Sequence, residues 1–234
     1  MRLLVSVTDS HEAKVVVEAG VDIVDVKNPA EGSLGAPAPG VIERVREVVP
    51  PDRPVSAAIG DLPNLPGTAA LAALGAARSG AAYVKVGLWG TSTMAEAVAL
   101  LRAVREAVGG GAVVIAGAYA DAERVSGGSL APGAVVAAAR RAGVGGCLLD
   151  TAVKDGRGLF EWLAPEALAE LVAEGHAGGL EMALAGALRA EDLSVVRTTG
   201  ADIAGVRSAA CRDGRRTAPL DAERIGRLRA ECES

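Results

Sequence analysis

Residues 83–120 read YVKVGLWGTSTMAEAVALLRAVREAVGGGAVVIAGAYA and contain the repeating unit of the whole chain. The β-branched run Tyr83–Leu88 predicts a strand, and the Ala-, Leu- and Arg-rich segment Thr93–Val108 has the period of a helix. Three glycines then lead into a second strand-like run, Val113–Ala120. A strand, a helix and another strand in this order are typical of a parallel sheet with crossover helices.

The same alternation extends in both directions from this unit and covers the chain. Eight strands are predicted, at Leu3–Val7, Asp22–Lys27, Pro54–Gly60, Tyr83–Leu88, Val113–Ala120, Gly146–Thr151, Leu180–Ala185 and Asp202–Arg207. Eight helices are predicted, at His11–Ala19, Pro39–Val49, Gly67–Ser79, Thr93–Val108, Pro132–Ala142, Pro165–Ala177, Ala190–Thr199 and Asp221–Cys232.

The number of units and the length of the chain together favour one architecture. Eight units in 234 residues leave about 29 residues for each unit, which suits a compact barrel. An open, doubly wound sheet normally has fewer strands and a G-x-G-x-x-G turn after the first one, which this sequence lacks. We therefore predict an α/β protein with a single (β/α)8 TIM barrel as its one domain, residues 1–234.

The composition disfavours several classes of partner. Although 50% of the residues are hydrophobic, no apolar run approaches the roughly 20 residues that span a bilayer. The opening MRLLVSV is too short for the core of a signal peptide, so we expect a cytoplasmic protein with no membrane contact. A net charge of −5 and few aromatic residues disfavour nucleic acid as a partner. We expect a small-molecule substrate, and the sequence is compatible with a homo-oligomer.

The cysteines do not indicate a metal site or a disulfide. Cys147, Cys211 and Cys232 are widely spaced, odd in number and form no C-x-x-C pair. We predict that all three are free thiols, either buried or incidental, and that the protein binds no metal.

The lysines are the most informative residues for function. The chain has 4 lysines among 24 basic residues, so arginine serves wherever a surface cation is needed. Lys14 falls on the exposed side of a predicted helix, whereas Lys27, Lys85 and Lys154 lie at or just beyond strand ends. Arginine stays protonated, but a lysine can lose its proton when it is desolvated. Lysines in these places indicate amine chemistry.

Strand alternation predicts which side chains point into the barrel. Val24 and Val26 on the second strand and Val84 and Val86 on the fourth suit the helix-facing positions. The residues that alternate with them, Asp25, Lys27 and Lys85, therefore point inward. Asp150 and Arg207 share the inward phase on the sixth and eighth strands. Polar groups from four strands therefore meet at the mouth of the barrel.

This arrangement suits attack by an amine on a carbonyl. Lys27 and Lys85 approach each other, and two ammonium groups in a partly desolvated pocket lower each other's pKa. We expect Asp25 to orient Lys27, and Asp150 and Lys154 to form an acid/base pair. The alternative is a structural Lys–Asp network that fills the polar upper layer of the barrel.

A second set of residues suggests phosphate binding. Barrels often bind phosphate with the loops after strands seven and eight. Here the small residues Gly186 and Ala187 follow strand seven, and Gly205, Arg207 and Ser208 lie at or after the end of strand eight. The alternative is that these glycines only make turns.

Two further loops follow strand ends. Residues 28–36 form a long Gly-rich stretch that is either a lid or a turn-rich connector. Asp61, after the third strand, belongs either to the active mouth or to a turn cap.

The motifs DVKNPAEGSLGA, SAAIGDLP…PGT, YVKVGLWG, AGAYADAERV, LLDTAVKDG and DIAGVRSAAC occur in this order along the chain. Together they resemble the (5-formylfuran-3-yl)methyl phosphate synthases, also called 4-hydroxymethyl-2-furancarboxaldehyde phosphate synthases. The resemblance implies a (β/α)8 lyase that condenses two molecules of glyceraldehyde 3-phosphate, a triose phosphate, with loss of phosphate and water.

The same resemblance implies roles for four residues. Lys27 forms the Schiff base, Lys85 acts as general base, and Asp150 and Lys154 supply the remaining acid and amine. No metal or organic cofactor is implied. The sequence departs from the family pattern at Ala187, where serine is typical, at Ser208, where glycine is usual, and at residues 212–216.

Two other functions stay open at this point. One is a class I aldolase that acts on a small sugar phosphate, since such enzymes also use paired barrel lysines. The other is a barrel that binds a phosphorylated metabolite without turning it over.

Overall fold

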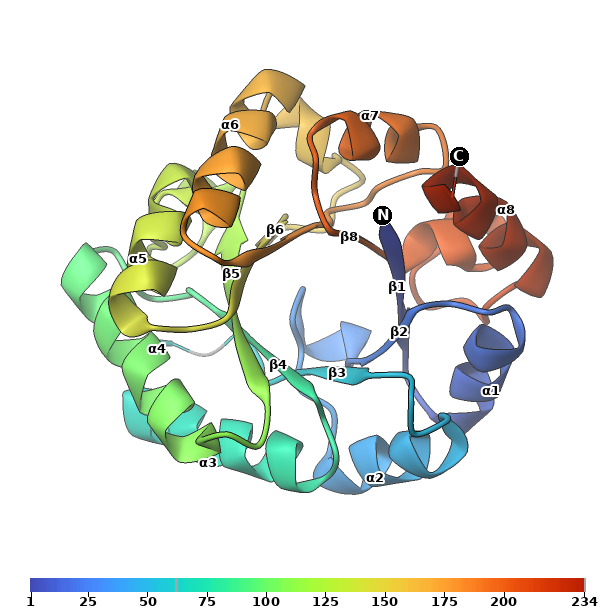
Figure 1. Cartoon of the computed structure of the whole chain (residues 1–234), viewed down its shortest axis with the longest axis horizontal. Helices are drawn as coiled ribbons and strands as arrows, with labels where there is room; N and C mark the ends of the chain where they lie inside the picture. Colours follow the sequence, from blue (N-terminus) through green and yellow to red (C-terminus); the bar gives the residue numbers. More distant parts are fainter. Residues whose placement is uncertain (62, 234) are drawn as a thin grey trace.

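The computed structural model describes residues 1–61 and 63–233 and shows a closed barrel of parallel strands inside a ring of helices (Figure 1). The strands are β1 (Arg2–Val7), β2 (Ile23–Val26), β3 (Val55–Ala58), β4 (Tyr83–Gly87), β5 (Val113–Tyr119), β6 (Gly146–Asp150), β7 (Glu181–Leu184) and β8 (Ile203–Val206). The helices are α1 (Ser10–Glu18), α2 (Pro39–Val48), α3 (Pro66–Arg78), α4 (Met94–Val108), α5 (Val135–Ala142), α6 (Pro165–Ala177), α7 (Asp192–Thr198) and α8 (Ala222–Glu233).

The predicted (β/α)8 barrel is confirmed, with each strand pairing with the next and β8 returning to β1. Most element ends differ from the prediction by one or two residues. The largest difference in a helix is at Pro132–Ala134, which forms a short 3₁₀ turn (η3) before α5. Short 3₁₀ turns are common at the ends of α-helices, and their sequence pattern does not separate them from the helix that follows.

Local sequence explains where the helices begin. In α4, Thr93 Oγ1 accepts a hydrogen bond from the Glu96 amide, while the Glu96 carboxylate accepts one from the Thr93 amide at 2.9 Å. This capping box satisfies two amides that have no partner within the helix. The buried face of α4, which includes Leu100, Leu101 and Val104, then packs against the strands.

Strand alternation divides the core into two layers. Outward-facing valines such as Val5, Val24 and Val84 pack under the helices. Inward-facing residues form a smaller cluster around the barrel axis that includes Leu4, Ile23, Ile115, Leu148 and Ile203. Residues two positions further along the same strands share this inward phase, so polar side chains above the apolar cluster must also face the axis.

A buried ion pair lies at the seam where β1 and β8 close the barrel. Arg207, directly after β8, donates from Nη1 to the Ser6 carbonyl of β1 at 2.9 Å. The same guanidinium makes two bonds to the Glu12 carboxylate of α1, at 2.6 and 3.1 Å. Glu12 also accepts hydrogen bonds from the amide and hydroxyl of Thr8. The pair therefore joins the first and last units of the barrel.

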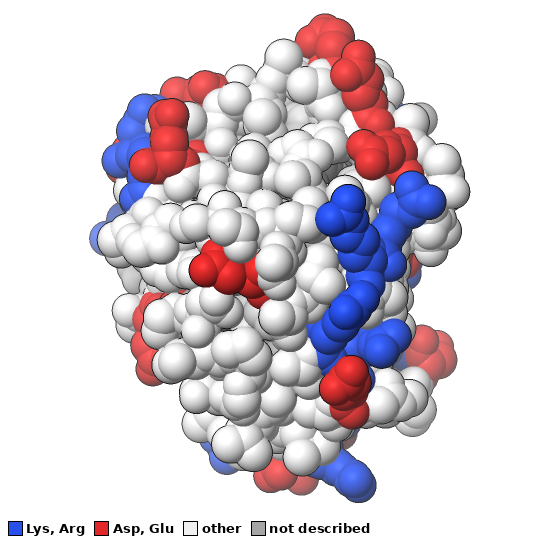
Figure 2. Space-filling view, turned by 90° about the vertical axis from the view of Figure 1, so that its left-hand side faces the viewer, with Lys and Arg blue, Asp and Glu red and all other residues white. Residues whose placement is uncertain are grey.

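Arginines cover the glycines that end several helices. Arg105 of α4 lies against Gly143, where a Cβ would meet Nη1 at 2.7 Å, and Arg140 of α5 lies in the same way against Gly178. Figure 2 shows Lys and Arg side chains gathered in one row on the side of the molecule that carries α4 and α5. A cation at a helix C-terminus is favourable because the last carbonyls carry partial negative charge. This packing accounts for part of the preference for arginine.

Within residues 1–61 and 63–233, no helix combines the length and the apolar character that crossing a membrane requires.

We predict that Glu12→Gln destabilises the barrel by about 3–5 kcal/mol, because the Arg207 charge stays buried without its carboxylate. The measurement is the free energy of unfolding from urea denaturation. Glu18→Gln, on an exposed position of the same helix, is the control and should change it by less than about 0.5 kcal/mol. Equal effects of the two changes would contradict a special role for this ion pair.

Candidate active site

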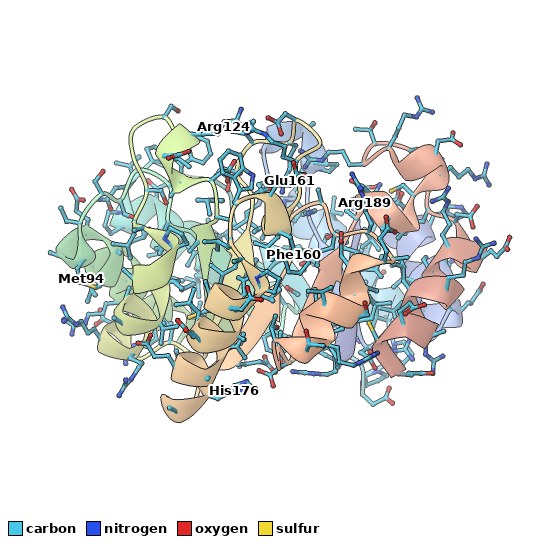
Figure 3. The ribbon with its side chains drawn as sticks, turned by 90° about the horizontal axis from the view of Figure 1, so that it is seen from above. Met94, Arg124, Phe160, Glu161, His176 and Arg189 are labelled. Carbon is cyan, nitrogen blue, oxygen red and sulfur yellow. The ribbon has the colours of Figure 1, made fainter. Side chains whose placement is uncertain are left out.

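A cavity of about 250 Å³ opens at the mouth of the barrel and extends down its axis. It is lined by residues from every strand and by the loops after β6, β7 and β8. Figure 3 shows the barrel from the side, with Arg124, Glu161 and Arg189 toward the mouth and His176 at the opposite end. Of the residues predicted for the site, Asp25, Lys27, Lys85, Asp150, Lys154, Gly186, Ala187, Gly205, Arg207 and Ser208 all line this cavity.

Strand register places Lys27 and Lys85 at the same level of the barrel. Val26 pairs with Ala57 of β3, and Ala57 pairs with Val84 of β4, so the next residues along each strand, Lys27 and Lys85, also correspond. Two strand spacings, about 10 Å, separate their backbones. The residue between them on β3 is Ala58, whose methyl group is too small to separate two long side chains.

Lys27 is the buried amine of the site. Its side chain lies within the cavity, and only 9% of the residue is exposed. Burial lowers the pKa of Lys27 to about 8, with further lowering by Lys154 and Lys85 and opposing effects of Asp150 and Asp25. At pH 7 about a tenth of this amine is therefore neutral, far more than for an ordinary lysine.

Asp25 was expected to orient Lys27, but in the structure it pairs with Lys85. Its Oδ1 atom pairs with Lys85 Nζ at 2.6 Å, and its Oδ2 atom accepts a hydrogen bond from Ser6 at 2.8 Å. Asp25 lies one inward layer below the two lysines, and the Lys85 side chain reaches down to it. The hydroxyl of Ser56, beside Asp25 on β3, is buried and has no hydrogen-bond partner among the described residues.

Asp150 and Lys154 form the second ion pair of the mouth. Lys154 Nζ lies 2.7 Å from Asp150 Oδ1 and 3.1 Å from Thr151 Oγ1. Burial alone would raise the pKa of Asp150, but Lys154, Lys27 and the Thr151 amide together hold it below its ordinary value. Each of the two carboxylates therefore has its own lysine, and Lys27 makes no ion pair within the described part of the chain.

A residue that the sequence did not single out holds the loop that carries Lys154. Asp121 is fully buried, and its two carboxylate oxygens accept the amides of Ala152 and Val153 at 2.6 and 2.9 Å. These bonds fix the backbone just before Lys154. The motif AGAYADAERV contains Asp121, but its sequence does not show that this carboxylate holds the loop after β6.

The loop after β7 has a backbone suited to an anion. Gly186 and Ala187 both have positive φ angles, 107° and 49°, and such a conformation is rare for alanine. The Gly186 carbonyl accepts a bond from the Leu159 amide at 2.9 Å. Because the carbonyl and N–H of one trans peptide point in opposite directions, the Ala187 N–H is turned away from that contact.

Arg207 lies at the mouth, but its donors are committed to the protein. Besides the three contacts at the seam, Nε donates to the Arg216 carbonyl at 2.9 Å, and Nη2 also contacts the Ala218 carbonyl. A guanidinium has five N–H donors, so no donor of Arg207 is left for a phosphate. The predicted phosphate role of Arg207 therefore gains no support from this geometry, whereas Gly205 and Ser208 do line the cavity.

Arg216 is a second residue that sequence reasoning did not select. It is half-buried, lines the cavity from the loop after β8, and donates from Nη2 to the Gly32 carbonyl at 2.9 Å. Burial lowers its pKa, which Asp150 opposes. The basic run at residues 212–216 was the available signal, but it does not show which arginine turns inward.

Residues 28–36, which we call the roof loop, cross the mouth. Leu34 is buried in the inner cluster, and its amide donates to Asp61 at 3.0 Å. Asp61 also accepts a hydrogen bond from Tyr119, and the Ser33 hydroxyl donates to the Thr151 carbonyl beyond β6. The stretch was expected to be either a lid or a turn-rich connector, and in the structure it lies over the mouth and is held there by Asp61, Thr151 and Arg216.

The cysteines are free and buried, as the sequence predicted. Burial raises the pKa of the Cys147 thiol to about 12 and that of Cys232 to about 11. Across residues 1–61 and 63–233, no group of three or more His, Cys, Asp or Glu side chains could hold a metal ion.

Known structures with a similar fold are TIM-barrel proteins of low sequence identity. The 3-hexulose-6-phosphate synthase from Salmonella typhimurium matches with a TM-score of 0.66 and 19% identity, covering 99% of this chain and all of that chain. The phosphoribosyl anthranilate isomerase from Thermus thermophilus matches with a TM-score of 0.62 and 18% identity, covering 100% of this chain and 98% of that chain. At such identities the likeness concerns the fold alone.

Comparison with known sequences identifies the family as well as the fold. The protein from Methanopyrus kandleri named (5-formylfuran-3-yl)methyl phosphate synthase is 53% identical over 218 residues, covering 92% of this chain and 91% of that relative. The protein of the same name from Methanocaldococcus jannaschii is 48% identical over 237 residues, covering both chains completely. The family model described as 4-HFC-P synthase matches residues 3–229. The chain belongs to the 4-HFC-P synthase family.

Proposed function

We propose that this enzyme condenses two molecules of glyceraldehyde 3-phosphate into (5-formylfuran-3-yl)methyl phosphate through a Schiff base on Lys27. The name of the relatives supplies the product. The observation that carries the mechanism is that three lysines line one cavity and that only two of them pair with a carboxylate there. Two lysines have a carboxylate partner, and the remaining one, Lys27, is a buried amine with a pKa of about 8.

The first step is attack by the neutral Lys27 amine on the carbonyl carbon of one triose phosphate. A C–N bond forms, the carbonyl oxygen leaves as water, and a cationic iminium remains. Proton transfers to the departing oxygen require an acid nearby. The Lys154 ammonium, held at 2.7 Å from Asp150, is in position to supply a proton and to recover one.

The second step is removal of a proton from the carbon next to the iminium. Lys85 stands across β3 from Lys27 and suits the role of base once it has lost its own proton. Asp25 contacts the Lys85 amine directly and is itself held by the Ser6 hydroxyl, so the amine keeps its place during this step.

The resulting enamine carbon can form the new C–C bond to the second triose phosphate. One phosphate then leaves, a hydroxyl closes the ring, and hydrolysis of the imine releases Lys27. The formulas of substrate and product balance when inorganic phosphate and two water molecules leave. The loops after β7 and β8 line the cavity where the phosphate groups would lie.

The product separates this function from that of a class I aldolase. We predict that the purified protein converts glyceraldehyde 3-phosphate into a compound with the ultraviolet absorbance of a furan aldehyde and releases one inorganic phosphate per product. Mass spectrometry and a phosphate assay are the measurements. A sugar phosphate formed without phosphate release would instead identify an aldolase.

Reduction with borohydride in the presence of glyceraldehyde 3-phosphate should attach the triose to Lys27, detectable by peptide mass spectrometry. Lys27→Arg should abolish both the adduct and turnover, because a guanidinium keeps its proton and cannot form the imine. Lys14→Arg, on an exposed position of α1, is the matched control and should retain both. An adduct on another lysine, with turnover intact in Lys27→Arg, would exclude this mechanism.

The rate of adduct formation should rise with pH through a midpoint near 8, since the neutral amine is the nucleophile. Below the midpoint each pH unit should lower the rate about tenfold. Lys154→Gln should move the midpoint upward, because the Lys154 charge lowers the pKa of Lys27. A pH-independent rate between 6 and 9, or an unmoved midpoint in the variant, would contradict this role.

The lowered pKa of Lys27 also affects the stability of the fold. Because the pKa is lower in the folded protein than in the unfolded chain, the free energy of unfolding should increase as pH rises from about 8 toward 10.5.

A further inference from the structure

Arg216 differs from the other arginines at the mouth in having donors to spare inside the cavity. Arg207 has all five donors on protein acceptors. Arg124 and Arg157 pair with Asp155 and lie over Trp162, outside the cavity. Within the described part of the chain, the Arg216 side chain makes one hydrogen bond, to the Gly32 carbonyl. Four of its five donors therefore have no protein acceptor there.

The position of Arg216 is fixed from both sides. Its backbone carbonyl accepts the Arg207 Nε donor at 2.9 Å, so the buried ion pair at the barrel seam also holds the backbone of this residue. Its Nη2 atom rests on the roof loop at Gly32. The rest of the guanidinium faces a cavity that contains Asp150, Lys154, Gly186 and Ser208. Such anchoring leaves a planar cation at a fixed place on the wall of the cavity.

Burial and charge both indicate an anionic ligand. A half-buried guanidinium with unused donors carries a cost that a bound anion would relieve. Phosphate suits it because two parallel N–H groups can donate to two phosphate oxygens. Lys154 is less available for this purpose, since it already contacts Asp150 and Thr151.

We propose that Arg216 binds the phosphate group of the substrate and thereby selects phosphorylated over unphosphorylated aldehydes. This inference rests on the proposed function for the identity of the aldehyde. Its basis in the structure is independent: an anchored arginine in the loop after β8 with free donors in the cavity. Because the same guanidinium holds Gly32, phosphate binding also adds a contact beneath the roof loop that follows Lys27.

The first experiment measures binding of inorganic phosphate by calorimetry and needs no turnover. Arg216→Gln should weaken binding about 10- to 100-fold, the usual range for losing hydrogen bonds to a charged group. Arg215→Gln is the matched control, because Arg215 is the neighbouring residue, is exposed and does not line the cavity. Equal binding in wild type and Arg216→Gln, or no binding to the wild type, overturns the proposal.

The second experiment compares two aldehydes in the borohydride reaction at Lys27. With glyceraldehyde 3-phosphate, Arg216→Gln should lower adduct formation at limiting substrate about 10- to 100-fold. With unphosphorylated glyceraldehyde, it should leave adduct formation unchanged, which also shows that the variant folds. An equal loss of adduct formation with both aldehydes means that Arg216 only holds the roof loop through Gly32, and the proposal fails. If the wild type forms no adduct with either aldehyde, the Schiff-base function fails, and the phosphate titration still decides the role of Arg216.

Discussion

Closure of the parallel sheet is the constraint on which the rest of this molecule depends. Once β8 pairs with β1, each strand has one face toward the helices and one toward a narrow axis, and every second side chain must occupy that axis. Apolar residues fill the lower part, as in the cluster around Ile23 and Leu148. Charged residues occupy the upper part, where they cannot turn outward without exchanging places with the valines beneath the helices.

That confinement gives the lysines their chemistry. Each buried charge is costly unless a partner compensates it, and only two carboxylates of the mouth pair with a lysine. Asp25 compensates Lys85, and Asp150 compensates Lys154. Lys27 has neither carboxylate as a direct partner and is influenced by both at longer range, so its proton is the one held least firmly. The reactive amine is thus defined by how the other four groups are paired.

The arginines of this chain serve a different purpose from its lysines. Arg207 and Glu12 join the two ends of the barrel, and Arg105 and Arg140 cover the ends of neighbouring helices. These positions need a permanent charge and several donors in fixed directions, which a lysine does not offer. Because Arg207 also holds the backbone of Arg216, the closing contact of the fold and the proposed phosphate contact of the site are adjacent.

The sequence by itself determined the barrel, the inward phase of the strands and the set of lysines at their ends. These follow from periods of 2 and 3.6 residues and from the choice of lysine over arginine, which are local properties of the chain. Only the tertiary structure decided which charges pair. It paired Asp25 with Lys85 instead of Lys27, committed the donors of Arg207 to the seam and turned Arg216 into the cavity. It also placed Asp121 where its carboxylate holds the loop that carries Lys154. Such pairings depend on the direction of long side chains and on loops from distant units meeting at one mouth. No local pattern records them, because the partners are brought together only when the eighth strand meets the first.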